Sequence, residues 1–393
     1  MTPSDALIIG GGPAGSAAAI LLAKVGWRVT LIERKEFPRR KVCGEYLSAT
    51  NWPLLRSLGI ADAFADMAGP PVRETAIFVG NKIARAPLPR PRDPSGLWGR
   101  ALSRENLDSL LLEQAVKLGV QVRQPARCIQ VKRASAGFRC QIETPRVQDL
   151  EEVEAKVVIA AHGSWDLGSL NTERQTSVTR TGDLLAFKAH FLDAALPPGL
   201  MPLLSFQGGY GGMAHCDGGR VSLSCCLRRD RLERLARAEG EPAGAAVLAH
   251  ILESCPALRP VLESAILTGP WLSAGPIRPE IRRCYADGVF VVGNAAGEAH
   301  PAVAEGISMA MQSAWLLTER LIATNDEQSV ARDYTRAWRR SFAPRIRAAA
   351  AIAHWTMRPR LVAATLPFFR TWPKLLTLGA WLSGKSKLVI QPT

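Results

Sequence analysis

The chain has 393 residues, of which 47% are hydrophobic and 21% charged, and it contains 33 glycines and 27 prolines. These values are typical of a globular protein with a sizeable core, and they exclude collagen-like, low-complexity and disordered classes. The formal net charge is +14, and residues 320–393 hold 13 Lys and Arg against 3 Asp and Glu, so the positive charge is concentrated near the C-terminus.

The eight cysteines include no Cys-x-x-Cys pair, which predicts neither a metal site nor a disulfide framework. No uninterrupted apolar run reaches the length of a membrane-spanning helix, and the first strand-like run begins by Ala6, too early for a secretory signal. We therefore expect a cytoplasmic location, with docking on the inner membrane face as the alternative that the basic C-terminal region leaves open.

The N-terminal segment is typical of a strand–helix–strand unit. A short apolar strand is predicted at Ala6–Ile9, and an Ala- and Leu-rich helix at Ser16–Val25 ends before Gly26. A second strand follows at Arg28–Ile32, with Glu33 at its end. This is the strongest structural signal in the sequence.

Between that first strand and helix lies the pattern Gly10-x-Gly12-x-x-Gly15. The three glycines permit a tight turn, close approach of a pyrophosphate and close helix–strand packing, and Glu33 is placed to accept the ribose hydroxyls. The alternative is a purely structural glycine turn. Because the sequence holds one such motif, we expect one resident dinucleotide, FAD, with NAD(P)H binding transiently as the electron donor.

The middle of the chain alternates between predicted strands and helices. A proline-rich segment, 70–97, surrounds a strand-like patch at Thr75–Val79, and a helix is predicted at Arg104–Leu118. Further strands are predicted at Val120–Arg123, Arg127–Lys132, Phe138–Glu143 and Lys156–Ala160, and antiparallel strands at Leu184–Phe191, Leu203–Phe206 and Val221–Leu227.

A glycine-rich turn is predicted at 208–212 and a helix at Pro242–Leu262. A buried strand at Val289–Val292 leads into a helix at Gly306–Ala323. The tail, 327–393, predicts two or three helices that break at Pro344, Pro359, Pro367 and Pro373.

Two further segments accompany the N-terminal motif. The first is the run 285–297 (YADGVFVVGNAAG), followed by Pro301 and by Glu305-Gly306-Ile307. The second is the run 41–48 (KVCGEYLS), and the helix that begins at Arg104 carries the pattern Arg-x-x-Leu-Asp-x-x-Leu. Together these segments resemble the superfamily of FAD-dependent aromatic hydroxylases and geranylgeranyl reductases, which share the fold of para-hydroxybenzoate hydroxylase. They also resemble flavoproteins that mature tryptophan-derived quinone cofactors.

The resemblance implies an FAD site. Its members are Gly10, Gly12, Pro13, Ala14, Gly15, Glu33, Arg34, Arg40, Cys43, Gly44, Arg104, Cys128, Gly293, Asn294, Gly297, Pro301, Gly306 and Ile307. The sequence departs from the family pattern at Asn294, where the family usually has Asp, and at His162-Gly163, where it often has Asp-Gly. The second departure bears on how NAD(P)H would reduce the flavin, since the family's Asp at this place takes part in flavin and nicotinamide interactions in some members.

Candidates for catalysis and substrate binding follow from the same segments. His300 precedes Pro301 in the segment expected to face the flavin, and histidine titrates near working pH, so it is a candidate acid or base. Cys43 is a candidate redox thiol, the alternative being a small residue packed against the flavin ring. Tyr210 and His215 are candidate substrate contacts, the alternatives being an exposed turn tyrosine and a structural histidine.

The predicted fold is α/β. A discontinuous Rossmann-type FAD-binding domain is expected from 1–70, 98–165 and 270–328. An inserted antiparallel β substrate domain is expected from 71–97 and 166–269, followed by a basic helical C-terminal region, 329–393.

The function that the resemblance implies is a FAD-dependent monooxygenase. It would use NAD(P)H and dioxygen to hydroxylate an electron-rich aromatic substrate, either a small molecule or a protein-borne tryptophan, through a flavin hydroperoxide. A reductase of isoprenoid double bonds is the first alternative. A flavoprotein that docks a partner protein with little turnover is the second.

The C-terminal region carries its own alternatives. Leu361–Leu382 mixes aromatic and aliphatic residues with basic ones, a pattern that suits a helix lying on an anionic membrane surface. It also suits a cap over the substrate domain or a contact for an acidic protein. No nucleic-acid-binding motif accompanies the arginines, so we expect no nucleic-acid partner.

Overall fold

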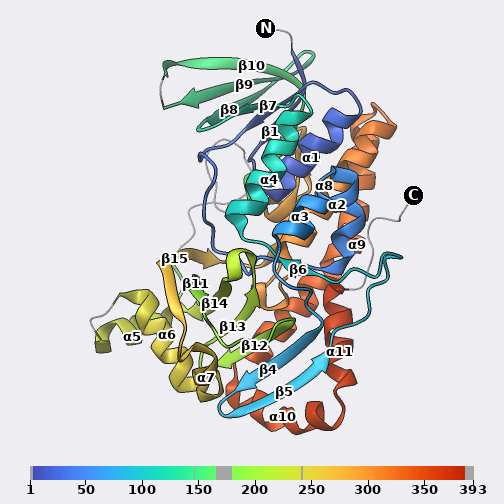
Figure 1. The fold of residues 1–393 in the computed structure, drawn as a ribbon. Coiled ribbons are helices and arrows are strands. Elements are labelled where there is room, and N and C mark those ends of the chain that lie inside the picture. Colours follow the sequence, from blue (N-terminus) through green and yellow to red (C-terminus); the bar gives the residue numbers. More distant parts are fainter. Residues whose placement is uncertain (1–2, 146, 165–178, 240–241, 386–393) are drawn as a thin grey trace.

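The computed structural model describes residues 3–145, 147–164, 179–239 and 242–385. Two sheets dominate it, one nearer each end of the molecule in Figure 1, and helices lie between and around them. The predicted α/β fold with a Rossmann-type domain is confirmed.

The first sheet contains the N-terminal strands. Its central strands run in the order β18-β10-β1-β2-β7 and are parallel throughout. At one edge β17 pairs antiparallel with β18, and β8 and β9 form a meander with β10. The bounds are β1 Ser4–Ile9, β2 Val29–Ile32, β7 Gln121–Arg123, β8 Arg127–Ala134, β9 Gly137–Thr144, β10 Val147–Ala160, β17 Tyr285–Ala286 and β18 Val289–Val291.

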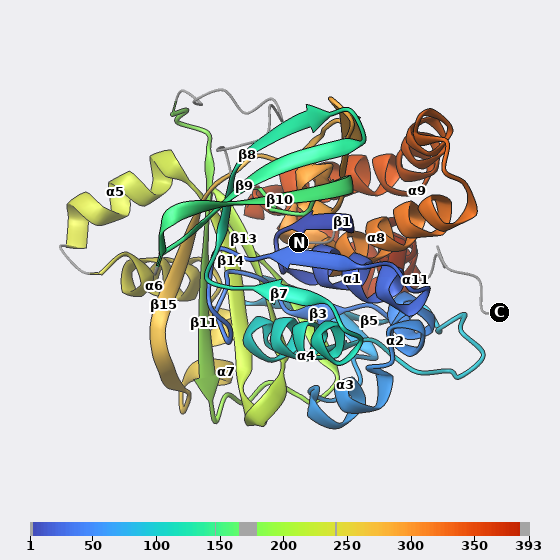
Figure 2. The same ribbon diagram turned by 90° about the horizontal axis from the view of Figure 1, so that it is seen from above.

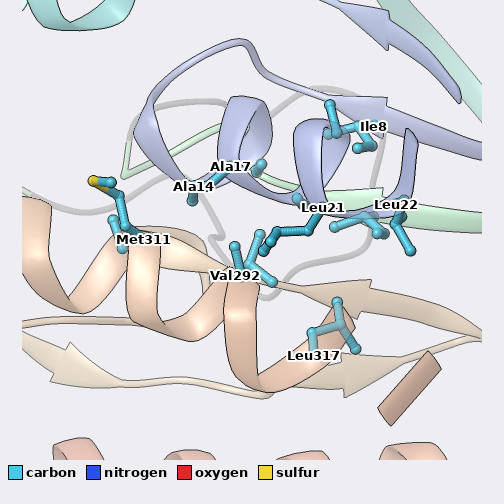
Figure 3. Packing of buried hydrophobic residues seen from close by; sticks show 14 of the residues in the cluster. Ile8, Ala14, Ala17, Leu21, Leu22, Val292, Met311 and Leu317 are labelled. Carbon is cyan, nitrogen blue, oxygen red and sulfur yellow. The ribbon is translucent and has the colours of Figure 1, made fainter. Parts of the chain in front are cut away.

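Helix α1 (Pro13–Lys24) packs between this sheet and helix α8 (Gly306–Ala323). Figure 3 shows Ala14, Ala17 and Leu21 of α1 facing Val292 and α8, in a core of small and branched apolar side chains. Small residues on α1 allow the close approach of helix and strand that places the start of α1 at the end of β1. Helix α4 (Arg104–Lys117) also packs against α1.

The second sheet has the order β15-β11-β14-β13-β12-β4-β5. Its bounds are β4 Glu74–Val79, β5 Lys82–Pro87, β11 Leu184–Leu192, β12 Leu200–Phe206, β13 Gly209–His215, β14 Val221–Arg228 and β15 Ile266–Ile277. The pairs are antiparallel except for β12 and β4, which run parallel. The predicted substrate domain is thus not wholly antiparallel, and the boundary predicted at 269/270 falls inside β15.

The glycine-rich segment 208–212, predicted as a turn, is largely strand β13. A Cβ on Gly209 would lie 2.1 Å from the Phe206 ring, and one on Gly211 would lie 3.0 Å from the Cβ of Cys225. These glycines therefore let neighbouring strands and rings approach closely, which the sequence pattern alone does not distinguish from turn formation.

Helices α5 (Arg229–Glu239), α6 (Ala243–Ser254) and α7 (Arg259–Leu262) accompany the second sheet. Val247 and Ile251 of α6 share a core with Phe187 and Phe206 of the sheet. The single helix predicted over 242–262 is wrong, because Cys255 adopts a non-helical conformation before Pro256. Among the described helices none is long and apolar enough to span a membrane alone, although α6 together with the bent segment Pro256–Leu262 meets length and composition criteria.

The C-terminal region forms α9 (Glu327–Thr356), α10 (Pro359–Thr371) and α11 (Lys374–Ala380), then one π-helical turn, Trp381–Lys385. The breaks predicted at Pro344 and Pro367 are wrong, since both prolines lie inside helices. Buried Trp338 and Phe342 precede Pro344, and buried Ile346 and Ala349 follow it. Packing on both sides of this proline outweighs the hydrogen bond that it removes.

Shorter elements complete the described chain. They are β3 Tyr46–Leu47, β6 Arg100–Ala101, β16 Glu280–Ile281, β19 Gly297–Glu298, α2 Trp52–Leu58 and α3 Ala61–Met67. Strands β3 and β6 pair antiparallel, and so do β16 and β19. Figure 2 shows, from above, the first sheet and α8 beside the second sheet.

Candidate active site

A cavity of about 430 Å³ lies where β1 meets the start of α1, and we call it the dinucleotide cavity. Sixteen of the predicted cofactor-binding residues line it: Gly10, Gly12, Pro13, Ala14, Glu33, Arg34, Arg40, Cys43, Gly44, Arg104, Cys128, Gly293, Asn294, Pro301, Gly306 and Ile307. The residues come from five separate stretches of sequence, so the fold gathers the predicted set at one place. Gly15 and Gly297 do not line it.

Gly15 lies behind the cavity wall, where it packs against the turn that carries Gly10. A Cβ at this position would lie 1.8 Å from the carbonyl oxygen of Gly10, which itself has a φ of +111°. Only glycine permits this contact between the turn and the helix. Gly297 is likewise a packing residue, because a Cβ there would lie 2.5 Å from the Trp338 ring.

The start of α1 presents an electropositive surface to the cavity. Gly12 is the residue that precedes α1, and the guanidinium groups of Arg104 and Arg39 lie 3.7 and 4.0 Å from the position of a Cβ on it. Arg104 forms two hydrogen bonds of 2.7 Å with buried Asp108, and Arg39 lies 3.7 Å from the same carboxylate. Free helix N–H groups with two anchored arginines suit a pyrophosphate.

Glu33 is fixed at the end of β2. One carboxylate oxygen accepts a hydrogen bond of 2.7 Å from the Gly11 N–H, and the other accepts one of 2.9 Å from the backbone N–H of Lys35. The side chain is buried and lines the cavity, in the position where the motif predicts a ribose acceptor.

The far end of the cavity is formed by the segment that follows β18. The Gly293 N–H donates to Ser313 of α8 over 2.7 Å. The Asn294 amide donates to Ser164 and Glu298 over 3.1 and 3.3 Å. Asn294 is therefore held in the cavity wall by uncharged and charged partners, although it lacks the carboxylate usual at this position. His162 and Gly163 also line this end.

A second cavity of about 390 Å³, which we call the apolar cavity, adjoins the first. Its walls are the second sheet on one side and α9, α10 and α11 on the other, and most of its lining is aliphatic, aromatic or sulfur-containing. The two cavities share Val42, Cys43, Gly44, Ile277, Pro301 and Ala304. They meet at the loop 41–48 and at the segment around Pro301, both of which the family resemblance places beside the flavin ring.

The predicted catalytic and substrate residues lie in different places relative to the two cavities. Cys43 is half-buried at the junction of the two cavities, and Tyr210 is buried in the wall of the apolar cavity rather than exposed in a turn. His215 lines neither cavity, and its Nε2 atom lies 2.7 Å from the Leu196 carbonyl oxygen.

His300 also lines neither cavity. It is buried, with Nδ1 3.3 Å from the Tyr210 hydroxyl and its ring edge-on to His354. Burial, with a smaller contribution from His354, lowers the pKa of His300 to about 4. The structure thus places His300 behind the cavity wall, in contact with Tyr210, where burial favours the neutral imidazole.

A buried charge cluster lies beneath the loop that lines both cavities at residues 42–44, which we call the shared loop. Glu45 forms an ion pair with Lys188 and lies 2.8 Å from Nε2 of His190, both on β11. It also accepts a hydrogen bond of 2.9 Å from the Arg104 N–H at the start of α4. Burial raises the pKa of Glu45, but His190 and Lys188 outweigh it and bring the pKa to about 2. The cluster links the dinucleotide cavity to the second sheet.

A second cluster closes the apolar cavity. The Lys385 ammonium donates to the Val303 carbonyl over 2.8 Å, lies 3.3 Å from Glu305 and sits above the Tyr46 ring. Burial lowers the pKa of Lys385, and Glu305 opposes that shift. Through this contact the end of the C-terminal region is held against the turn that precedes α8.

Lys41 is a further member of the dinucleotide cavity that the predicted cofactor set omits. Burial, Arg104 and Arg39 lower the pKa of Lys41 to about 8. Glu45, Lys188 and Lys385 are likewise absent from the predicted site residues. A signal was present for one of them: Lys188 and His190 are two residues apart in an otherwise apolar strand, which places both side chains on one face.

The sequence is similar to those of several reductases and of one receptor. The chain is 26% identical over 355 residues to conditioned medium factor receptor 1 of Dictyostelium discoideum, covering 83% of this chain and 64% of that protein. It is 30% identical over 161 residues to menaquinone reductase of Mycobacterium tuberculosis, covering 41% and 38%. A digeranylgeranylglycerophospholipid reductase of Methanopyrus kandleri is 27% identical over 320 residues, covering 77% and 73%. The chain thus spans less than two thirds of the first two relatives.

Solved structures show the same fold. The flavin-dependent brominase Bmp2 superposes with a TM-score of 0.76 at 20% identity, covering 98% of this chain and 94% of that one. A geranylgeranyl bacteriochlorophyll reductase-like protein of Thermoplasma acidophilum gives 0.68 at 19% identity, covering 99% and 94%.

The family model described as "FAD binding domain" matches residues 3–207, more than half of the chain. The stretch contains β1, α1, the shared loop and the start of α4. The Gly10–Gly15 cradle, the arginines and the anchored Glu33 described above fit FAD. On these grounds the chain belongs to the FAD binding domain family.

Proposed function

We propose that the protein is an FAD-dependent monooxygenase that hydroxylates a small, apolar, electron-rich aromatic substrate held in the apolar cavity. The observation that carries the proposal is the junction of the two cavities at Val42-Cys43-Gly44 and Pro301. A substrate in the apolar cavity would lie against the end of the dinucleotide cavity that the family motifs assign to the flavin ring.

The chain's own residues contribute binding, orientation and exclusion of water. Bound FAD supplies the redox chemistry, with NAD(P)H as transient electron donor and dioxygen as the second substrate. The Gly12 region with Arg104 would hold the pyrophosphate, and Glu33 would hold the ribose. The aliphatic walls of the apolar cavity would orient the aromatic ring and keep water from the reacting atoms.

The lining favours a small molecule over a protein-borne tryptophan. Phe369, Leu376 and Ala380 of α10 and α11 form part of the wall, so these helices stand between the cavity and a protein that approaches from their side. Lys385 is the only charged side chain among the described lining residues, and Glu305 is its partner. The cavity therefore offers little to a highly charged substrate.

A reductase of isoprenoid double bonds is the second candidate, and a specific observation favours it. Reducing a carbon–carbon double bond requires a hydride equivalent and a proton, and the Cys43 thiol lies where the cavities meet. Burial raises the pKa of Tyr210 well above its ordinary value, so its hydroxyl stays protonated, and the residue lines the same cavity. The archaeal relative named above is a reductase of an isoprenoid lipid.

Isotope labelling separates the two candidates. The FAD-loaded protein is supplied with NADH or NADPH and with phenol, indole, a tryptophan peptide or geranylgeraniol under ¹⁸O₂. The proposal predicts faster NAD(P)H consumption with an aromatic probe and one ¹⁸O atom in the product. Reduced geranylgeraniol without label would instead support the second candidate. A failure of every aromatic probe to accelerate NAD(P)H consumption would contradict the monooxygenase.

A further inference from the structure

An exposed apolar face covers the outer side of α10, α11 and the turn that follows. We call it the docking face, and its members are 43–57% exposed: Leu361, Phe368, Trp372, Leu375, Leu378, Trp381 and Leu382. Phe368 and Trp372 are stacked with ring centroids 6.2 Å apart. So large a concentration of exposed aromatic and aliphatic side chains on adjacent helices marks an interaction surface.

Cations surround the docking face. Arg358, Arg360, Arg370 and Lys374 are exposed on the same segment. No Asp or Glu occurs anywhere in residues 334–393. The face therefore combines bulky apolar side chains with positive charge that its own segment does not balance, as in helices that lie in the interface of an anionic bilayer.

The inner side of these helices is firmly packed. Val362 and Leu366 are fully buried against Ile77 and Val79 of β4. Arg370 donates from Nε to the Ile83 carbonyl over 3.0 Å, and Thr377 donates to the Pro87 carbonyl over 2.8 Å. The docking face is thus the outer surface of an anchored layer, and it lies at the end of the molecule remote from β8 and β9 (Figure 1).

The same layer forms a wall of the apolar cavity. Phe369, Leu376 and Ala380 line that cavity from within, while Phe368, Trp372 and Leu378 are exposed outside. Only the thickness of one helical layer separates the docking face from the place where the substrate would bind.

We propose that the docking face lies on an anionic phospholipid bilayer. An acidic protein would need the cations, but it would not explain why so many aromatic and aliphatic side chains remain in water. A bilayer accounts for both, because lipid headgroups match the arginines and acyl chains match the rings. A corollary, which rests on the proposed function, is that a lipid-soluble substrate reaches the apolar cavity from the membrane.

Vesicle co-sedimentation of the FAD-loaded full chain tests the proposal without turnover. The vesicles are phosphatidylcholine alone or phosphatidylcholine mixed equally with phosphatidylglycerol. We expect binding to the anionic vesicles. The pair Phe368→Ser/Trp372→Ser should weaken it at least about tenfold, since each ring buries substantial apolar area, and Arg360→Gln/Lys374→Gln should weaken it to a similar extent.

The matched control is Val116→Ser/Lys117→Gln, which changes an exposed apolar residue and its neighbouring cation at the end of α4, away from α10 and α11. This control should bind as the unchanged protein does, and retained FAD reports folding of every variant. Absence of binding to anionic vesicles would overturn the proposal. So would binding that is indifferent to Phe368→Ser/Trp372→Ser, or equal binding to poly-glutamate, which would indicate an acidic protein partner. None of these outcomes decides the redox reaction.

Discussion

At the scale of single residues, Glu45 connects the loop of residues 41–48 with β11 and with the start of α4. Its backbone has a φ of +63°, and its carboxylate is bonded to Lys188, to His190 and to the start of α4. Left-handed backbone is unfavourable for a residue with a side chain, so these contacts must stabilise it. Glu45 thereby orients Cys43 and Gly44, the residues common to both cavities.

Replacing this carboxylate tests that role. Glu45→Gln should lower the free energy of unfolding by about 3–5 kcal/mol, because it leaves the buried Lys188 ammonium without a counter-ion. The control Glu152→Gln removes an exposed carboxylate that pairs with Arg139 and should cost less than about 1 kcal/mol. Urea unfolding of the FAD-loaded variants measures both values.

The double variant Glu45→Gln/Lys188→Met removes both charges. It should be less destabilised than Glu45→Gln alone, since no unpaired ion remains. If the two changes simply add, the ion pair is not what stabilises the loop.

The same carboxylate makes stability depend on pH. The folded-state pKa of Glu45, about 2, is below the ordinary value of 4.5 that it regains on unfolding. Its contribution is therefore fully present above about pH 4.5 and is lost as the pH falls through about 2. Unfolding free energies between these pH values should decline less steeply for Glu45→Gln than for the unchanged protein. Parallel curves would contradict the assignment.

His300 shows what residue type alone leaves undetermined. Its place beside Pro301 agreed with a catalytic role, but the contact with Tyr210 and the burial that lowers its pKa to about 4 depend on β13 and α9. Neither neighbour is close to it in the sequence.

At the scale of elements, the turn between β1 and α1 depends on the contact between Gly15 and the Gly10 carbonyl. Gly15→Ala places a methyl group 1.8 Å from that oxygen, so the turn must open. Because overpacking costs about 1–3 kcal/mol, FAD binding should weaken about ten- to hundredfold. Flavin absorbance per protein after dialysis measures it. Gly182→Ala, whose added methyl meets nothing within 4 Å, is the control and should retain FAD. Equal retention by the two variants would contradict this role of Gly15.

The elements that the sequence predicted well are those with local causes. The β1–α1–β2 unit and α8 (Gly306–Ala323) have apolar runs bounded by glycine, and their predicted limits lie within a few residues of the observed ones. By contrast, β13 and the uninterrupted α9 depend on neighbours. From the sequence alone Gly209 indicates a turn, but in the fold it allows Phe206 to pack closely against its strand. Pro344 likewise indicates a helix break, but the burial of Trp338 and Ile346 on either side keeps the helix continuous.

At the scale of the whole molecule, the function rests on how three regions meet. Residues 42–44 also line the dinucleotide cavity, Tyr210 belongs to the second sheet, and Ala380 belongs to the C-terminal helices, yet all line the apolar cavity. Motifs predicted the dinucleotide cavity because family spacing encodes it. They did not predict the apolar cavity, because its walls are ordinary core residues whose proximity arises only from the packing of α10 and α11 on the second sheet.

The most direct test of the account is whether the apolar cavity holds an aromatic molecule beside the flavin. Indole is titrated into the FAD-loaded protein, and the change in flavin absorbance is followed for the unchanged protein, Ala380→Phe and Ala351→Phe. Ala380 lines the cavity, whereas Ala351 is an exposed residue of α9 outside it. We expect a saturable change in the unchanged protein and in Ala351→Phe, and at least about tenfold weaker binding in Ala380→Phe, whose ring occupies the site. Equal titration curves for all three proteins would contradict it.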